Sequence, residues 1–142
     1  MILLDTDHLT VLKYHDSERA KQLTTRLATA SAIGESIGVT VIGVEEQMRG
    51  WMSAIAKERN PLRMVGPYRE LASLFDFFRG FHLALFTEAA AEIFSGFSAI
   101  RIKSTDRKVA AIALANRALL LTANRRDFEQ IPGLKIENWL AG

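Results

Sequence analysis

Short apolar runs alternate along the chain with longer segments in which apolar residues recur every three to four positions. The short runs predict strands at Ile2–Asp5, Ser36–Ile42, His82–Phe86, Ala118–Thr122 and Leu134–Glu137. The helical spacing predicts helices over 17–30, 44–58, 68–78, 87–97 and 105–116. Strands that are apolar throughout are typical of a parallel sheet covered on both faces. We therefore expect an α/β protein with three layers, in which helices cover both sides of a central parallel sheet of about five strands.

Two of the expected helices carry an apolar stripe. In the helix over 44–58, the stripe consists of Met48, Trp51, Met52 and Ile55. After Pro67, a second stripe consists of Tyr68, Leu71, Leu74, Phe75 and Phe78. We expect both stripes to pack into the core, and we interpret the aromatic residues of the second stripe as core residues rather than a binding site.

The composition is that of an ordinary globular protein. The 142 residues are 49% hydrophobic and 24% charged, which favours one domain over residues 1–142 that needs neither disulfides nor a structural metal ion. The lack of cysteine excludes thiolate catalysis and cysteine-ligated zinc. No run approaches the roughly 20 apolar residues that span a bilayer, and the first residues lack the charged and cleavable apolar stretches of a secretion signal. We therefore expect a cytoplasmic protein that does not bind a membrane.

Positive charge is concentrated in one late segment of the sequence. Between Arg101 and Arg126, seven basic residues accompany a single acid, Asp106. The seven are Arg101, Lys103, Arg107, Lys108, Arg117, Arg125 and Arg126. Such a segment is either a solvated helix face or a binding surface for a polyanionic substrate.

Acidic side chains occur where strands end and where helices begin. They are Asp5 and Asp7 after the first strand, Glu45 and Glu46 after the second, Asp106 at a helix start, and Asp127, with Asn124, after the fourth strand. Because the carboxyl ends of parallel strands and the starts of the following helices share one edge of a sheet, we expect these side chains to converge.

Several of these residues also have a purely structural interpretation. We expect Asp7 to cap a helix that begins at His8, and Gly43 to occupy the N-cap position of the helix that carries Glu46. The three histidines lie in different segments without the spacing of metal ligands, and we expect structural roles for them at surface or partly buried positions. They are His8, His15 and His82.

Carboxylates that lie close together repel one another and raise one another's pKa values unless a cation lies among them. Mg²⁺ takes oxygen ligands, keeps several waters and suits an acidic site without cysteine or histidine. Hydrolysis of phosphodiester bonds is the chemistry that such a site serves best. The basic segment would then contact a nucleic-acid backbone.

Five segments of the sequence together resemble the PIN-domain ribonucleases, and closely those that act as VapC toxins of type II toxin-antitoxin pairs. They read "LLDTDHL", "GVEEQMRG", "TDRKVAAIALA", "LLLTANRRDF" and "IPGLKIENW", and the resemblance extends from Leu3 to Trp139. It implies a parallel five-stranded sheet, dependence on Mg²⁺ or Mn²⁺, cleavage of RNA, frequent homodimers and inhibition by a small cognate antitoxin.

The resemblance also implies a set of site residues. It assigns the acidic cluster to Asp5, Glu46, Asp106 and Asp127, with Glu46 chosen over Glu45 because it precedes Gly50 by four residues. We expect Asp5 and Asp106 to be the main metal ligands. Thr6, Thr122 and Asn124 would support the site, and Arg125 and Arg126 are candidates for contacts with RNA phosphates.

Two positions depart from the family pattern. The family usually has threonine where Gly43 stands and aspartate where Asn124 stands. The first departure removes a hydroxyl near Glu46, and the second leaves Asp127 as the acid of its segment. Both affect the expected strength of metal binding, but neither removes one of the four main acids.

Other protein classes also place acids after a first apolar strand. A haloacid-dehalogenase-like phosphatase has an Asp-x-Asp there, but it needs a lysine and a further strand with paired acids after the threonine that corresponds to Thr122, and only 20 residues follow it. A receiver domain has an acid after a central strand, whereas the third strand here is followed by Thr87. An RNA-processing PIN-domain nuclease without a toxin role stays open.

Overall fold

A parallel sheet forms the centre of the computed structural model, which describes residues 1–140. Within that range its strands are β1 (Ile2–Leu4), β2 (Ile37–Thr40), β3 (His82–Ala84), β4 (Leu119–Leu121) and β5 (Lys135–Glu137). They lie in the order β3-β2-β1-β4-β5, and every neighbouring pair is parallel. β1 is therefore the central strand, and all three of its residues are buried because both faces of the sheet are covered.

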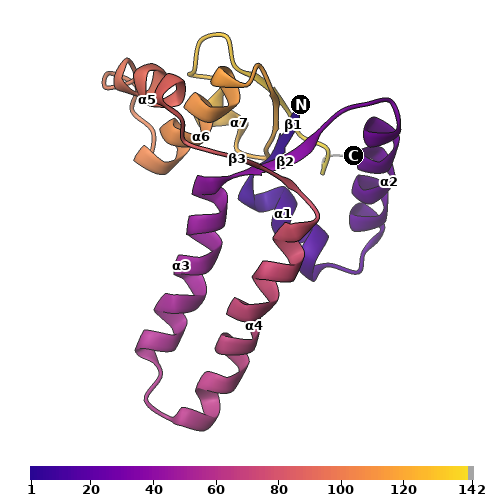
Figure 1. The fold of residues 1–142 in the computed structure, drawn as a ribbon, viewed down its shortest axis with the longest axis vertical. Coiled ribbons are helices and arrows are strands. Elements are labelled where there is room, and N and C mark those ends of the chain that lie inside the picture. The colour runs from indigo at the N-terminus through magenta and orange to yellow at the C-terminus, as the bar shows by residue number, and fades with distance from the viewer. Residues whose placement is uncertain (141–142) are drawn as a thin grey trace.

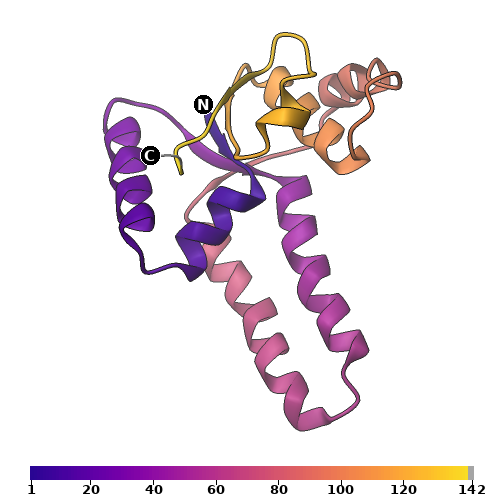
Figure 2. The same cartoon turned by 180° about the vertical axis from the view of Figure 1, so that it is seen from behind.

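Helices cover both faces of the sheet (Figures 1 and 2). They are α1 (Thr6–Tyr14), α2 (Glu18–Ala32), α3 (Val41–Lys57), α4 (Pro61–Arg79), α5 (Glu88–Ser95), α6 (Ser104–Ala115) and α7 (Arg125–Phe128). Leu3 packs into a core with α5, α6 and α7, whereas its neighbours Ile2 and Leu4 pack on the opposite face with α1 and α2. This alternation confirms the three-layer α/β architecture and the parallel sheet of five strands that the sequence predicts.

The strands are shorter than the apolar runs that predicted them, because each run also supplies the start of the next element. The run at Ser36–Ile42 yields a strand that ends at Thr40, since the Thr40 hydroxyl accepts a hydrogen bond from the Gly43 N–H (3.0 Å) and begins α3. Gly43 is thus the third residue of the helix. The prediction that Gly43 is the N-cap was wrong, and the helix that carries Glu46 has a hydroxyl cap after all.

The helix α4 begins seven residues earlier than the sequence predicts. Asn60 caps it by accepting a hydrogen bond from the Leu62 N–H (3.0 Å), and Pro61 takes the first helical position, where a missing N–H costs nothing. Pro67 therefore lies inside α4. Gly66 precedes it, and because glycine has no Cβ, the clash that usually ends a helix before proline is reduced.

The two apolar stripes are not core stripes over their full length. Helices α3 and α4 pack against each other as an antiparallel hairpin that extends beyond the sheet (Figures 1 and 2). Only Leu74 is buried in α4, while Tyr68, Phe75 and Met52 are 55%, 63% and 55% exposed. The prediction that the aromatic residues belong to the core was wrong for Tyr68 and Phe75, because the outer part of the hairpin has no other element to pack against. Phe78, near the sheet, does pack against the core, as predicted.

Within residues 1–140, no helix is both long enough and apolar enough to cross a lipid bilayer.

Candidate active site

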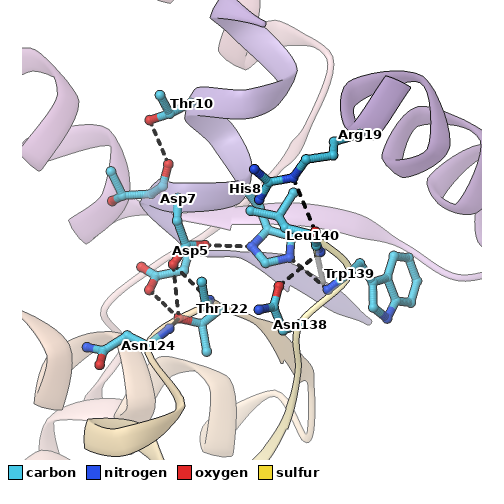
Figure 3. A network of polar contacts seen from close by, with 12 residues as sticks. Asp5, Asp7, His8, Thr10, Arg19, Thr122, Asn124, Asn138, Trp139 and Leu140 are labelled. Atoms are coloured by element: carbon cyan, nitrogen blue, oxygen red, sulfur yellow. Dashed lines mark hydrogen bonds and ion pairs between the residues drawn. The ribbon is translucent and has the colours of Figure 1, made fainter. Parts of the chain in front are cut away.

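The carboxyl ends of β1 and β4 lie side by side at one edge of the sheet and carry the first part of the site. The Asp5 N–H donates to the Leu121 carbonyl (2.9 Å), which brings Asp5 next to Thr122. The Thr122 hydroxyl is buried and donates to Oδ2 of Asp5 (2.8 Å), as Figure 3 shows. Two residues 117 positions apart are thus joined directly, as the convergence argument predicts.

Asp5 is the acid that its surroundings perturb most. Burial and the negative charges of Asp7 and Asp106 raise its pKa to about 6, against the opposing effect of hydrogen bonds from the Thr6 N–H and the Thr122 hydroxyl. A cation close to Asp5 would stabilise the ionised carboxylate and lower its pKa.

Of the two adjacent glutamates on α3, only one faces the other acids. Glu45 points to the surface and forms an ion pair with Arg49 (2.6 Å). Glu46 is half-buried, and burial together with the charge of Asp106 raises its pKa, partly offset by Lys103. The structure therefore places Glu46, and not Glu45, beside the acidic cluster.

Asp106 links the acids that come from different segments. It lies in the first turn of α6, and its pKa is raised by burial and by the charges of Asp127 and Asp7, against the opposing charge of Lys103. Its own charge raises the pKa values of Asp5 and Glu46. Lys103 is a basic residue of the site that the sequence did not single out from the seven in its segment.

The short helix α7 carries the last predicted acid. Asn124 precedes the helix, and its side-chain amide donates to Oδ2 of Asp127 (3.1 Å), so Asn124 orients the acid at this end of the site. Arg125 and Arg126 are both exposed. Arg125 forms an ion pair with Glu129 (3.2 Å), whereas Arg126 has no ion-pair partner within residues 1–140.

Asp7 does not cap α1, so that prediction was wrong. The helix begins at Thr6, with Asp5 at the N-cap position and Asp7 in the first turn. The Asp7 carboxylate instead accepts hydrogen bonds from the Ala123 N–H (2.8 Å) and from Nδ1 of His8. Burial opposes its ionisation, but these hydrogen bonds outweigh burial and lower its pKa.

The acids are coupled electrostatically but do not form a closed metal cage. Within the part of the chain that the structure describes, no three histidine, aspartate or glutamate side chains lie close enough together to hold an ion. Mg²⁺ is usually held by one or two carboxylates, with waters and substrate phosphates completing its shell. The predicted ligands fit that pattern, because all of them are oxygen atoms and because Asp5 and Asp106 have raised pKa values. The buried Thr6 hydroxyl beside Asp5 also has no hydrogen-bond partner within residues 1–140.

Solved structures share this fold over nearly the whole chain. No family model matches the sequence, and no curated protein matches it. A chain of VapBC from Salmonella typhimurium, solved bound to DNA, is 22% identical, with 97% of each chain covered and a TM-score of 0.76. A chain of VapBC-1 from nontypeable Haemophilus influenzae is 19% identical, with 99% of this chain and 100% of that chain covered and a TM-score of 0.74.

A third similar structure is VapBC2 from Rickettsia felis, solved bound to a DNA fragment from its promoter. Its chain is 20% identical, with 98% of this chain and 99% of that chain covered and a TM-score of 0.72. These similarities confirm the PIN-like α/β fold that the sequence resemblance implies. The strand order also argues against a receiver domain, since β1 lies between β2 and β4, whereas a receiver domain has its third strand beside the first.

Proposed function

We propose that this protein is a metal-dependent ribonuclease that hydrolyses phosphodiester bonds of RNA and acts as the toxin of a VapBC-type toxin-antitoxin pair. One observation carries the proposal. Carboxylates from four separate segments lie near the carboxyl edge of the sheet, close enough for Asp106 to be electrostatically coupled to Asp5, Glu46 and Asp127. A folded protein tolerates such repulsion where function requires it.

In this proposal, Asp5 and Asp106 hold the metal ion, and Glu46 and Asp127 complete the cluster. Mg²⁺, or Mn²⁺ in its place, would neutralise charge on the phosphate and activate a water molecule. The Glu46 carboxylate would position the attacking water, and its raised pKa would make it a stronger base than an ordinary glutamate. Thr122 and Asn124 orient Asp5 and Asp127 through the hydrogen bonds described above.

The basic residues near the site would contact the substrate backbone. Lys103 lies beside Asp106 and Glu46, and the exposed side chain of Arg126 is free to meet a phosphate. Arg125 must first give up its ion pair with Glu129.

The activity can be tested with purified protein and a mixture of total cellular RNA. We expect cleavage in Mg²⁺ or Mn²⁺, none in excess EDTA, and a large loss in Asp106→Asn. The control is Asp76→Asn, which removes an exposed carboxylate from α4 and should leave cleavage unchanged. Full activity in EDTA or in Asp106→Asn would overturn the metal-dependent mechanism, and no cleavage of any RNA would overturn the nuclease proposal. Turnover of an aryl phosphate through a phosphoaspartate would favour the phosphatase instead.

The toxin role requires a separate test. Structures of similar fold are complexes named VapBC, and we propose a small cognate antitoxin, encoded next to this gene, as the partner. Induced expression of the chain should arrest growth, and co-expression of the neighbouring small protein should restore it. Cleavage of RNA without growth arrest would indicate an RNA-processing nuclease. We also propose a homodimer, which light scattering of the purified protein can check.

A further inference from the structure

The imidazole of His8 lies in α1, between the acidic cluster and the C-terminal segment, 138–140, and it is fully buried, so the prediction of a surface or partly buried position was wrong for this histidine. Its Nδ1 is 2.5 Å from Oδ1 of Asp7, and its Nε2 accepts a hydrogen bond from the Trp139 N–H (3.1 Å). Figure 3 shows the ring spanning these two groups. Both ring nitrogens therefore have a partner, and the two partners are 132 residues apart.

The two partners determine which nitrogen carries the proton. A backbone N–H can only donate, so Nε2 must be unprotonated to accept from Trp139. The neutral ring then carries its proton on Nδ1 and donates it to Asp7. A ring protonated on Nε2 would face the Trp139 N–H with a second donor.

Asp7 connects His8 to the residues that follow β4. While Oδ1 is held by His8, Oδ2 accepts from the Ala123 N–H (2.8 Å) and lies 3.3 Å from the Thr122 hydroxyl. The same hydroxyl donates to Asp5 (2.8 Å). Because the hydroxyl has a single proton, its longer contact with Asp7 shares that proton with the shorter hydrogen bond to Asp5. His8 is thus connected to the first acid of the site through Asp7 and the end of β4.

The far end of this chain of contacts is itself fixed. Arg26 lies over the indole ring of Trp139, with 4.0 Å between the guanidinium carbon and the ring centroid. Arg19 donates to the carbonyl of Leu140 (3.2 Å), and the Leu140 side chain is buried. The C-terminal segment is therefore held against α2 at the position from which Trp139 reaches His8.

We propose that His8 is a positioning residue: its Nδ1–H tautomer, imposed by the Trp139 N–H, holds the Asp7 carboxylate against the end of β4 and thereby orients Asp5. The importance of this relay for catalysis rests on the proposed nuclease function. The relay itself is a property of the fold and can be measured without metal or RNA.

Two substitutions separate the two hydrogen bonds of the ring. His8→Asn keeps a donor close to the Nδ1 position and loses the acceptor for Trp139. His8→Gln keeps an acceptor close to the Nε2 position and loses the donor to Asp7. Because both place an amide in the same buried site, each controls for the other. His15→Gln, at the exposed position that follows α1, controls for the substitution itself.

The first measurement is NMR of ¹⁵N-labelled protein in EDTA. In the wild type, the ring nitrogens of His8 should have the shifts of a neutral imidazole protonated on Nδ1. His8→Gln should shift the amide resonance of Ala123 and leave that of Trp139 near its original position, and His8→Asn should do the reverse. A ring protonated on Nε2, or an unchanged Ala123 resonance in His8→Gln, would overturn the proposal.

The second measurement is RNA cleavage in Mg²⁺ alongside thermal unfolding. We expect His8→Gln to lose roughly 10- to 100-fold in kcat, the usual effect of removing a group that orients a ligand, and His8→Asn to stay near wild type. Equal losses in both variants that follow their melting temperatures would indicate a purely structural residue and overturn the proposal. A wild type that cuts no RNA would count against the proposed function alone, since the NMR result is independent of it.

Discussion

The carboxyl group of Asp5 combines burial with two negative neighbours, Asp7 and Asp106, and its pKa is raised to about 6. The ordinary value is 3.8, so folding makes this group harder to ionise. Between these two pH values the folded state binds more protons than the unfolded state, and the stability of the protein therefore falls as the pH rises. Above pH 6 the ionised group destabilises the fold, and below about pH 4 the effect is absent.

We predict that Asp5→Asn stabilises the metal-free protein at neutral pH. Each pKa unit corresponds to about 1.4 kcal/mol, so the gain in the free energy of unfolding should be on the order of 3 kcal/mol above pH 7 and disappear near pH 4. Asn also retains an oxygen that can accept from the Thr122 hydroxyl. Urea unfolding in EDTA at several pH values measures the difference.

The matched control is Asp76→Asn, whose carboxylate is 83% exposed and should show no such pH-dependent gain. A difference between Asp5→Asn and wild type that is the same at pH 4 and pH 7.5 would contradict the prediction. The opposite sign would mean that the hydrogen bond from Thr122 outweighs burial and charge repulsion.

At the scale of single residues, the sequence predicts where the acids lie better than what each acid does. The position of Asp5 follows from the end of an apolar run, and the choice of Glu46 over Glu45 agrees with its half-buried place beside Asp106. The roles of Asp7 and His8 could not be predicted, because the partners Ala123 and Trp139 are more than 100 residues away along the chain. No local spacing encodes such contacts.

At the scale of elements, the junctions between strands and helices decide where the site residues point. The strand β2 passes directly into α3 through the Thr40 cap, so Glu46 lies in the second turn of a helix that starts at the sheet edge. Val41 and Ile42, which follow the strand, are also apolar. The hydrophobic pattern alone therefore does not show where the helix begins. The pattern predicts that both elements exist, but not where one ends and the next begins.

Two glycines on neighbouring elements should respond to alanine in opposite directions. A Cβ on Gly38 of β2 would lie 2.7 Å from the carbonyl oxygen of His82 and 3.1 Å from the Leu3 side chain, so Gly38→Ala must push β3 away from β2. A Cβ on Gly50 of α3 meets no atom within 4 Å. We predict that Gly50→Ala stabilises by about 0.5–1 kcal/mol.

For Gly38→Ala we expect a loss of about 1–3 kcal/mol, typical of overpacking. Urea unfolding of both variants at pH 7.5 checks the signs, and hydrogen exchange of the β3 amides locates the damage. Equal stability of Gly38→Ala and wild type would mean that the edge strand β3 can move away without cost. Destabilisation by Gly50→Ala would mean that α3 is not helical at this position.

At the scale of the whole molecule, the order of the strands and the path of the α3–α4 hairpin are the features that the sequence does not reveal. Each strand reads alike as a short apolar run, and nothing local states that β3 lies at the edge beside β2 while β1 lies in the centre. The apolar stripes of α3 and α4 read as core stripes, although Phe75 and Met52 are mostly exposed. A pattern shows that a residue is apolar, but only the tertiary arrangement shows whether anything covers it.

The distribution of charge over the molecule leads to a test of how RNA is held. The acidic cluster would repel a phosphate backbone, and basic side chains at its rim must offset this repulsion. Arg125 and Arg126 are neighbours on α7, both exposed, but only Arg125 is engaged in an ion pair, with Glu129. Removing Arg125 would also leave Glu129 without its ion-pair partner, whereas removing Arg126 would take away one positive charge alone. Arg126 is therefore the cleaner residue to test.

We predict that Arg126→Ala weakens RNA binding and reduces its salt dependence. Loss of one phosphate contact should lower the slope of log K against log salt concentration by about 0.7 for single-stranded RNA. Fluorescence anisotropy with a labelled RNA, in an Asp106→Asn background that prevents cleavage, measures the slope. Arg79→Ala on α4, which removes an exposed and paired arginine, should leave it unchanged. An unchanged slope in Arg126→Ala would place the phosphate contacts elsewhere, with Lys103, beside Asp106 and Glu46, as the next side chain to test.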